Sequence, residues 1–327
     1  ILDTLHAIDP QHSRAFQEKG HLQMANRELQ PAIDAYESAV ARDPALIVSW
    51  KALMGLHAMD NNPKGANTAR IHVEKLQALP QELLNISSLI NEKRLDIAEP
   101  LCRKFLQQDP HNVEAMRLLA AIGVELGITD DAEQLLEAAL KFDPGFHHGR
   151  FDYVGVLQQR QKFEAAFNHA NHLKEACPDD VNYKRLYANI CINVGRYDEA
   201  IETYHEVLTV DPENPQILLM CGHAAKTIGR IQEAIDYYRR CYMAKPEYGD
   251  AFWSLANLKT YSLSDEELAI ARRSEAAEKT SVVDRIHLCF ALGKALEDRG
   301  EHTSSFEYYE RGNQLKLDQL AYDSNLI

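Results

Sequence analysis

Residues 211–246 read DPENPQILLMCGHAAKTIGRIQEAIDYYRRCYMAKP, and this stretch decides the fold. Pro215 favours the start of a helix, because the first helical turn leaves backbone N–H groups unpaired and proline has none. Gly229 favours a helix end, since glycine readily adopts the left-handed conformation found there. Apolar residues recur at three- and four-residue steps on both sides of Gly229. The stretch therefore predicts two amphipathic helices joined by a tight turn.

The same unit recurs along the chain. We expect a small residue where the two helices cross, because a larger side chain would push their backbones apart. A proline closes each copy and repeats from Pro44 to Pro246 with nearly the same spacing. The crossing position is held by seven alanines at steps of 34 residues, with one step of 32: Ala32, Ala66, Ala98, Ala132, Ala166, Ala200 and Ala234.

A helix–turn–helix unit with a period of 34 residues resembles the tetratricopeptide repeat. The first copy carries the resemblance at Gly20, Ala32, Tyr36, Ala39 and Pro44, and the sixth and seventh copies repeat the pattern. The resemblance implies an all-α fold, a right-handed α-solenoid of about nine antiparallel helix pairs. The alternative is an irregular helical domain in which the spacing arose by chance. The matching periods of the alanines and the prolines disfavour it.

The repeat pattern divides the chain into four segments. We expect residues 1–12 to end a preceding repeat helix and residues 13–248 to form seven helix pairs. We expect residues 249–316 to form two divergent terminal pairs. Residues 317–327 are expected to form a C-terminal helix end or a linker toward a missing downstream domain. We expect Pro100 either to lie near the first turn of its helix, where proline is tolerated, or to kink the helix. Ser264 and Glu267 match a capping box, which predicts a helix from about Asp265.

Composition bounds the function. The formal net charge is −14, from 35 Lys and Arg against 49 Asp and Glu, which argues against nucleic acid as a partner because phosphate binding needs a positive surface. No apolar run approaches the roughly 20 residues of a membrane helix, so we expect no membrane partner. The six cysteines lack CxxC spacing, and we expect them to be free and buried in a reducing, cytoplasmic compartment.

The sequence contains no pattern that predicts an active site. It has no phosphate-binding glycine loop and no GxSxG nucleophile turn. His169 and His172 lack the four-residue step and the glutamate of a zinc-binding helix. We therefore expect no catalytic residue, no metal site and no bound cofactor in these 327 residues.

The tetratricopeptide resemblance does imply a binding surface. In such arrays the first helix of each pair lines a concave groove that holds a protein or an extended peptide. Cations and amides dominate the matching positions, so an acidic peptide is the expected ligand. An ordinary solvated helix face is the alternative interpretation. The candidate groove residues are Lys51, Arg117, Arg185, Asn189, Asn193, His223, Lys226, Trp253, Asn257 and Lys294.

Residues 221–316 are also similar to the repeat region of bacterial fusion proteins in which tetratricopeptide repeats precede a sulfotransferase domain. The matching pieces include GHAAKTIGR, AFWSLANLKTY and SFEYYERGNQLK. The similarity implies that the chain is the recognition region of a sulfotransferase, and that the catalytic domain that binds the sulfate donor PAPS is absent from these residues. The alternative is a free-standing adaptor that assembles a protein complex without an attached enzyme.

Overall fold

The computed structural model describes residues 12–320, which form eighteen α-helices and, within that range, no strand. The predicted all-α fold is therefore confirmed. The predicted helix end at residues 1–12 lies outside the described residues except for His12, which caps the first described helix. Residues 321–327 of the predicted C-terminal segment also lie outside them.

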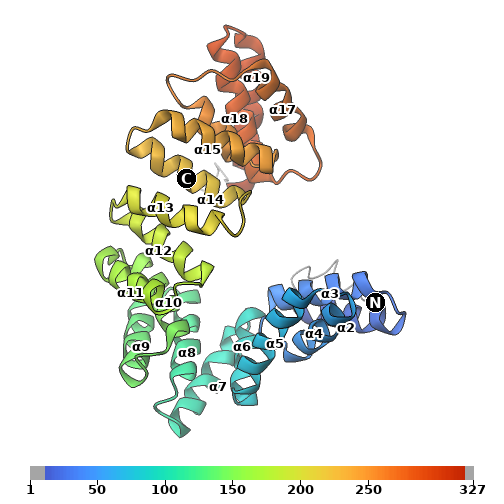
Figure 1. Cartoon of the computed structure of the whole chain (residues 1–327), viewed down its shortest axis with the longest axis vertical. Helices are drawn as coiled ribbons and strands as arrows, with labels where there is room; N and C mark the ends of the chain where they lie inside the picture. The colour runs from blue at the N-terminus through green and yellow to red at the C-terminus, as the bar shows by residue number, and fades with distance from the viewer. Residues whose placement is uncertain (1–11, 321–327) are drawn as a thin grey trace, which may run out of the picture. The chain divides into compact units, whose positions relative to one another are not determined.

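The chain divides into two compact units, Ile1–His169 and Ala170–Ile327, and the boundary falls within α11 (Phe163–Ala176). The first unit contains the helices coloured from blue to green in Figure 1. Its helices are α2 (Ser13–Ala25), α3 (Leu29–Arg42), α4 (Ile47–Met59), α5 (Pro63–Gln77), α6 (Gln81–Asn91), α7 (Leu95–Gln108), α8 (Val113–Glu125), α9 (Thr129–Phe142) and α10 (His147–Gln159).

The second unit continues the same alternation of helices. Its helices are α12 (Val181–Asn193), α13 (Tyr197–Leu208), α14 (Pro215–Thr227), α15 (Ile231–Ala244), α16 (Gly249–Ala256), α17 (Asp265–Ala276), α18 (Val282–Asp298) and α19 (His302–Leu320).

Within each unit, consecutive helices pack as pairs, and several second helices also contact the first helix of the following pair. In the first unit, α2 packs on α3, α4 on α5 and α8 on α9, while α3 also contacts α4. In the second unit, α12 packs on α13 and α14 on α15, and α13 also contacts α14. This stacking of helical hairpins is the arrangement of an α-solenoid, in which each repeat buries its apolar face against its neighbours.

Short turns join the paired helices and need one residue with positive φ. Gly229 has a φ of 80° at the turn after α14, as the sequence predicts, and Gly127 and Gly195 serve the same role after α8 and α12. Arg27 and Asn61 adopt the same conformation after α2 and α4. The turn geometry is therefore kept in copies that lack the glycine.

Small residues lie where the paired helices cross. Six of the seven repeat alanines are completely buried: Ala32, Ala98, Ala132, Ala166, Ala200 and Ala234. Ala66 is only half-buried, and Ala69, with 1% exposed, packs in the core of that pair instead. In this pair the close approach to α4 is made by Gly65, where an added Cβ would lie 2.8 Å from the His57 ring.

Pro100 is the sixth residue of α7 and so lies beyond the first turn. Proline has no N–H to donate to the carbonyl four residues earlier, so the helix continues past it with one backbone hydrogen bond fewer. Of the two sequence-based alternatives, a place in the first turn is excluded.

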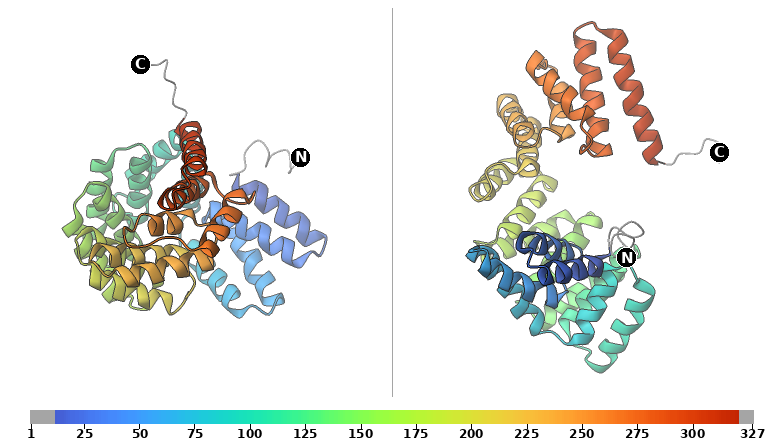
Figure 2. Two further views of the ribbon diagram at one scale, coloured as in Figure 1. Left: turned by 90° about the horizontal axis from the view of Figure 1, so that it is seen from above. Right: turned by 90° about the vertical axis from the view of Figure 1, so that its right-hand side faces the viewer.

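The pattern changes after α15, as the sequence predicts, but the eighth pair does not close on itself. α16 is only eight residues long, and it packs against α18, which also contacts α17. The predicted capping box is present at the start of α17, where the Glu267 N–H donates to the Ser264 hydroxyl at 3.2 Å. The last pair, α18 and α19, runs side by side in the right-hand view of Figure 2. At its crossing the Ser305 hydroxyl donates to the Gly293 carbonyl at 2.7 Å.

Replacing Ala234 by leucine tests the crossing position. The side chain is completely buried, and overpacking such a site costs about 1–3 kcal/mol. We expect the free energy of unfolding in urea to fall by that amount, whereas Glu202→Leu on the exposed face of α13 should change it by no more than about 0.5 kcal/mol. Equal losses for the two variants would show that the crossing is not tightly packed.

Candidate functional site

The structure places the candidate groove residues on the first helices of their pairs. Lys51 and Arg117 lie on α4 and α8 of the first unit. In the second unit the candidate residues lie on α12, α14, α16 and α18, and Asn257 is the C-cap of α16. The second unit therefore holds eight of them: Arg185, Asn189, Asn193, His223, Lys226, Trp253, Asn257 and Lys294.

Tyrosines of the second helices hold two of these side chains. The Tyr204 hydroxyl donates to Oδ1 of Asn189 at 2.6 Å, and the Tyr238 hydroxyl lies 3.0 Å from Nδ1 of His223. Both tyrosine rings are completely buried. A bond through Oδ1 leaves the two amide hydrogens of Asn189 for a further acceptor, and a bond at Nδ1 leaves Nε2 of His223.

His21 has the same role in the first unit, and the sequence analysis did not select it. Its Nδ1 lies 2.7 Å from the Tyr36 hydroxyl. His21 and Tyr36 are 15 residues apart, as are Asn189 and Tyr204. The fifteen-residue separation from a repeat tyrosine is thus the sequence signal that identifies this position.

Three cations of the set are open to solvent. Arg185 on α12 and Lys226 on α14 are both exposed, and neither forms an ion pair with another described residue. Lys51 in the first unit is also exposed. Lys294, in contrast, is half-buried and bonds to Asp298 one turn along α18. Of the candidate cations in the second unit, Arg185 and Lys226 are therefore the ones that a ligand can reach.

Arg117 is engaged within the first unit. Its guanidinium donates to both carboxylate oxygens of Glu114, at 2.6 and 3.0 Å, and to Asp152 on α10 at 2.8 Å. Burial alone would lower the pKa of Arg117, but the hydrogen bonds and charges of the two carboxylates raise it. Only 13% of the side chain is exposed, so this arginine ties α8 to α10.

An aromatic pair lies at the end of the set. The ring centroids of Trp253 on α16 and Phe290 on α18 are 5.7 Å apart, with the rings tilted by 50°. The Asn257 amide donates to the Trp253 carbonyl at 2.9 Å. Trp253 is half-buried, and its ring packs against Phe290.

The described residues offer little to covalent or metal chemistry. Between residues 12 and 320, no three or more His, Cys, Asp and Glu side chains are grouped closely enough to share a metal ion. Burial raises the pKa of the Cys102 thiol to about 11 and that of Cys221 to about 12, and such thiols are poor nucleophiles at neutral pH. Within the same range we find no helix with the length and apolar character that a membrane span requires.

Removing Arg117 should weaken the fold of the first unit. Because Arg117→Ala leaves the carboxylates of Glu114 and Asp152 facing each other without a cation, we expect a loss of about 3 kcal/mol in the free energy of unfolding. Lys51→Ala, at an exposed position of the same unit, is the control and should cost at most about 0.5 kcal/mol. A loss in Arg117→Ala no larger than the control's would refute the structural role.

The pKa of His223 predicts a pH dependence of stability. Burial lowers this pKa, Lys226 lowers it further, and Asp250 opposes the shift. Since the unfolded chain has a histidine pKa of about 6.5, it takes up the proton first as the pH falls, and the folded state loses stability below that value. The difference in Tm between pH 7 and pH 5 should therefore be smaller in His223→Gln, whose amide can still accept from Tyr238. An unchanged difference would contradict the assignment.

Three segments match models of known repeats. Residues 89–145 and 215–248 each match a model described as a tetratricopeptide repeat, and residues 188–229 match a model described as a TPR repeat. Together these segments lie in both compact units.

Curated relatives are similar to this chain over longer stretches. The peroxisomal targeting signal receptor of Eremothecium gossypii is 26% identical over 251 residues, covering 75% of this chain and 38% of the receptor. Anaphase-promoting complex subunit 7 of Mus musculus is 22% identical over 284 residues, covering 82% and 49%. The probable UDP-N-acetylglucosamine–peptide N-acetylglucosaminyltransferase SPINDLY of Solanum lycopersicum is 33% identical over 112 residues, covering 33% and 12%. The chain thus spans less than half the length of each of these relatives.

Among solved structures, MamA residues 41 to the end from Desulfovibrio magneticus align with a TM-score of 0.47 at 13% identity, covering 50% of this chain and 93% of that one. A further MamA crystal structure aligns with a TM-score of 0.46 at 18% identity, covering 50% and 96%.

Proposed function

Because three segments of this chain match tetratricopeptide repeats, we propose that it is a scaffold that binds an extended, acidic peptide of a partner protein along the first helices of the second unit. The observation that carries the proposal is the set of tyrosine hydrogen bonds. Tyr204 and Tyr238 fix Asn189 and His223 at the same repeat position of consecutive pairs, 34 residues apart. Side chains held in this way bind with less loss of conformational entropy than free ones.

The donors left at these positions suit a peptide backbone. Asn189 keeps two amide hydrogens, and His223 keeps an N–H at Nε2 when Tyr238 donates to Nδ1. Such groups pair with carbonyl oxygens of any extended segment, whatever its sequence. Repeated donors on adjacent first helices would thus recognise the shape of an extended chain.

Charge supplies the preference among peptides. Arg185 and Lys226 are exposed, and their charges are not neutralised by a described carboxylate. Hydrogen bonds from such cations to a carboxylate are about twice as strong as neutral ones. An acidic side chain on the ligand is therefore favoured, and added salt should weaken the complex.

The named roles of two relatives support a binding function. One is a receptor for a targeting signal and another is a subunit of a complex. The predicted association with a sulfotransferase stays a prediction, because it rests on the sequence pieces between Cys221 and Lys316 alone. The parent sequence beyond residue 327 decides between it and a free-standing adaptor: a strand followed by a PAPS-binding loop supports the sulfotransferase, and a stop codon supports the adaptor.

Reversing the two exposed cations tests the binding surface. We expect the double variant Arg185→Glu, Lys226→Glu to bind acidic peptides at least about tenfold more weakly, which corresponds to about 1.4 kcal/mol, while its Tm stays close to that of the parent. The measurement is fluorescence anisotropy with acidic and neutral peptides chosen from an array.

The matched control reverses Lys104 and Arg272, which are exposed on the second helices α7 and α17. It changes the net charge by the same amount, so any difference between the two double variants reports position. The proposal fails if both variants lose the same affinity, or if the array shows no preference for acidic over neutral segments.

A further inference from the structure

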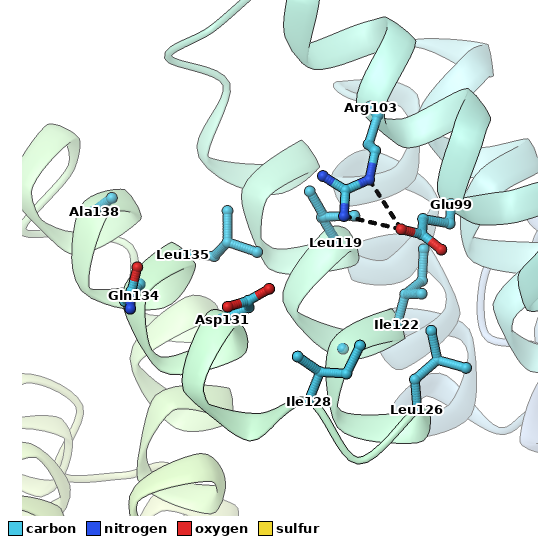
Figure 3. Close-up of a pocket in the computed structure, with 11 residues that line it drawn as sticks. Glu99, Arg103, Leu119, Ile122, Leu126, Ile128, Asp131, Gln134, Leu135 and Ala138 are labelled. Atoms are coloured by element: carbon cyan, nitrogen blue, oxygen red, sulfur yellow. Dashed lines mark hydrogen bonds and ion pairs between the residues drawn. The ribbon is translucent and has the colours of Figure 1, made fainter.

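A second candidate site lies in the first unit, in a pocket of about 350 Å³ between α7, α8 and α9. Figure 3 shows Leu119 and Ile122 of α8 in the pocket wall, with Leu135 of α9 opposite. The mouth is formed by Leu126 and Ile128, on either side of the α8–α9 turn. Both mouth residues are large apolar side chains, and nearly half of each is exposed.

This pocket is separate from the candidate groove. Leu119, Ile122 and Leu126 follow one side of α8, and Arg117 lies on the opposite side because a helix has about 3.6 residues per turn. A ligand in the pocket would therefore not contact the groove position of α8. The inference goes beyond the proposed function and does not depend on it.

The other repeats show that the apolar mouth is not required by the fold. At the position of Ile128, the next three pairs carry Lys162, Arg196 and Arg230. Lys162 and Arg230 extend from this turn to carboxylates of the preceding pair. Ile128 alone of these four exposes an apolar side chain at a site where a cation serves the packing of the repeats.

The same comparison explains why the pocket is open. Ala138 lines it from α9, and the corresponding residues of the next three pairs are His172, Glu206 and Arg240. A long polar side chain at this place would fill the space between successive second helices. A small residue inside and an apolar residue at the mouth occur together only in this pair among the four.

The charges at the rim favour a basic ligand. Glu99 and Arg103 of α7 neutralise each other through a hydrogen bond of 2.9 Å, drawn as a dashed line in Figure 3. On the opposite rim, Asp131 is exposed and forms no ion pair with another described residue. The rim thus keeps one negative charge beside an apolar cavity.

We propose that this pocket binds a partner peptide that inserts one bulky apolar side chain, of leucine or phenylalanine size, next to a lysine or arginine. The apolar side chain fills the space beside Leu119 and Leu135, and its neighbouring cation meets Asp131. The volume of about 350 Å³ is ample for one such anchor, because it is within the range of about 300–1,000 Å³ that holds whole small molecules. The preferred charge is opposite to that proposed for the groove.

Selection from random peptides tests the proposal without a known partner. Phage-displayed peptides are selected against the parent chain and against Ile128→Lys, which restores the type of residue that the following repeats carry and should fold normally. We expect the parent alone to enrich sequences that have a bulky apolar residue beside lysine or arginine. Identical enrichment on both proteins, or enrichment without the apolar–basic pair, overturns the proposal.

The enriched peptide, labelled with fluorescein, then measures each part of the site. Ala138→Trp, which fills the cavity, should raise the Kd at least about tenfold, as the loss of a buried anchor does. Asp131→Lys should raise it about threefold, in keeping with an exposed ion pair. The control Glu137→Trp, on the same helix but not lining the pocket, should change it less than twofold.

The groove variant separates this site from the proposed function. Arg185→Glu, Lys226→Glu should bind the basic peptide as the parent does, because neither residue lines the pocket. If that variant loses the peptide while Ala138→Trp and Asp131→Lys keep it, the peptide binds in the groove and the pocket proposal is wrong. Loss in the pocket variants alone supports it, provided that their circular dichroism matches the parent's.

Discussion

In the first, seventh and last helix pairs, the packing depends on the close contact between a glycine on the first helix and a tyrosine ring on the second. In the seventh pair, a Cβ atom added to Gly222 would overlap the ring of Tyr238. The buried ring extends across the crossing, so its hydroxyl reaches His223 one residue further along α14. The contact that closes the pair therefore also fixes a polar side chain on the candidate groove, and packing and binding geometry share one tyrosine.

The repeat period made most of the helices predictable, because each copy carries its own start, turn and crossing signals. Where those signals are missing, the prediction lost detail. Ala66 keeps the spacing but not the burial, and Ala69, three residues further along α5, is buried instead. α16 ends at Ala256 and packs on α18, which periodicity could not show because the pairing follows contacts between segments and not the order of the chain.

The partners of individual side chains were harder to predict than the helices. Glu114, three residues before Arg117 on the same helix, can be found from the sequence, but Asp152 comes from the next pair and can be found only when the stacking of the repeats is known. Arg117 thus lies at a groove position of the repeat, but its contacts serve the packing of α8 against α10. Arg185, at the same position two pairs later, has no such carboxylate and stays exposed.

A repeat protein supplies its own controls, because residues needed for stacking recur and residues needed elsewhere do not. Lys162 and Arg230 occupy a turn position where they reach carboxylates of the preceding pair, so the fold accounts for them. Ile128 at the same position forms no such ion pair and is left nearly half exposed beside Leu126, so the stacking of the repeats does not account for it. The acidic excess of the chain favours a basic partner at this pocket, because a net charge of −14 attracts basic segments. The proposed groove for acidic peptides would then be a local exception, whereas the proposed pocket for a basic peptide agrees with the net charge of the chain. Two surfaces with opposite preferences would allow one chain to hold two different partners without competition between them, which is what a scaffold requires.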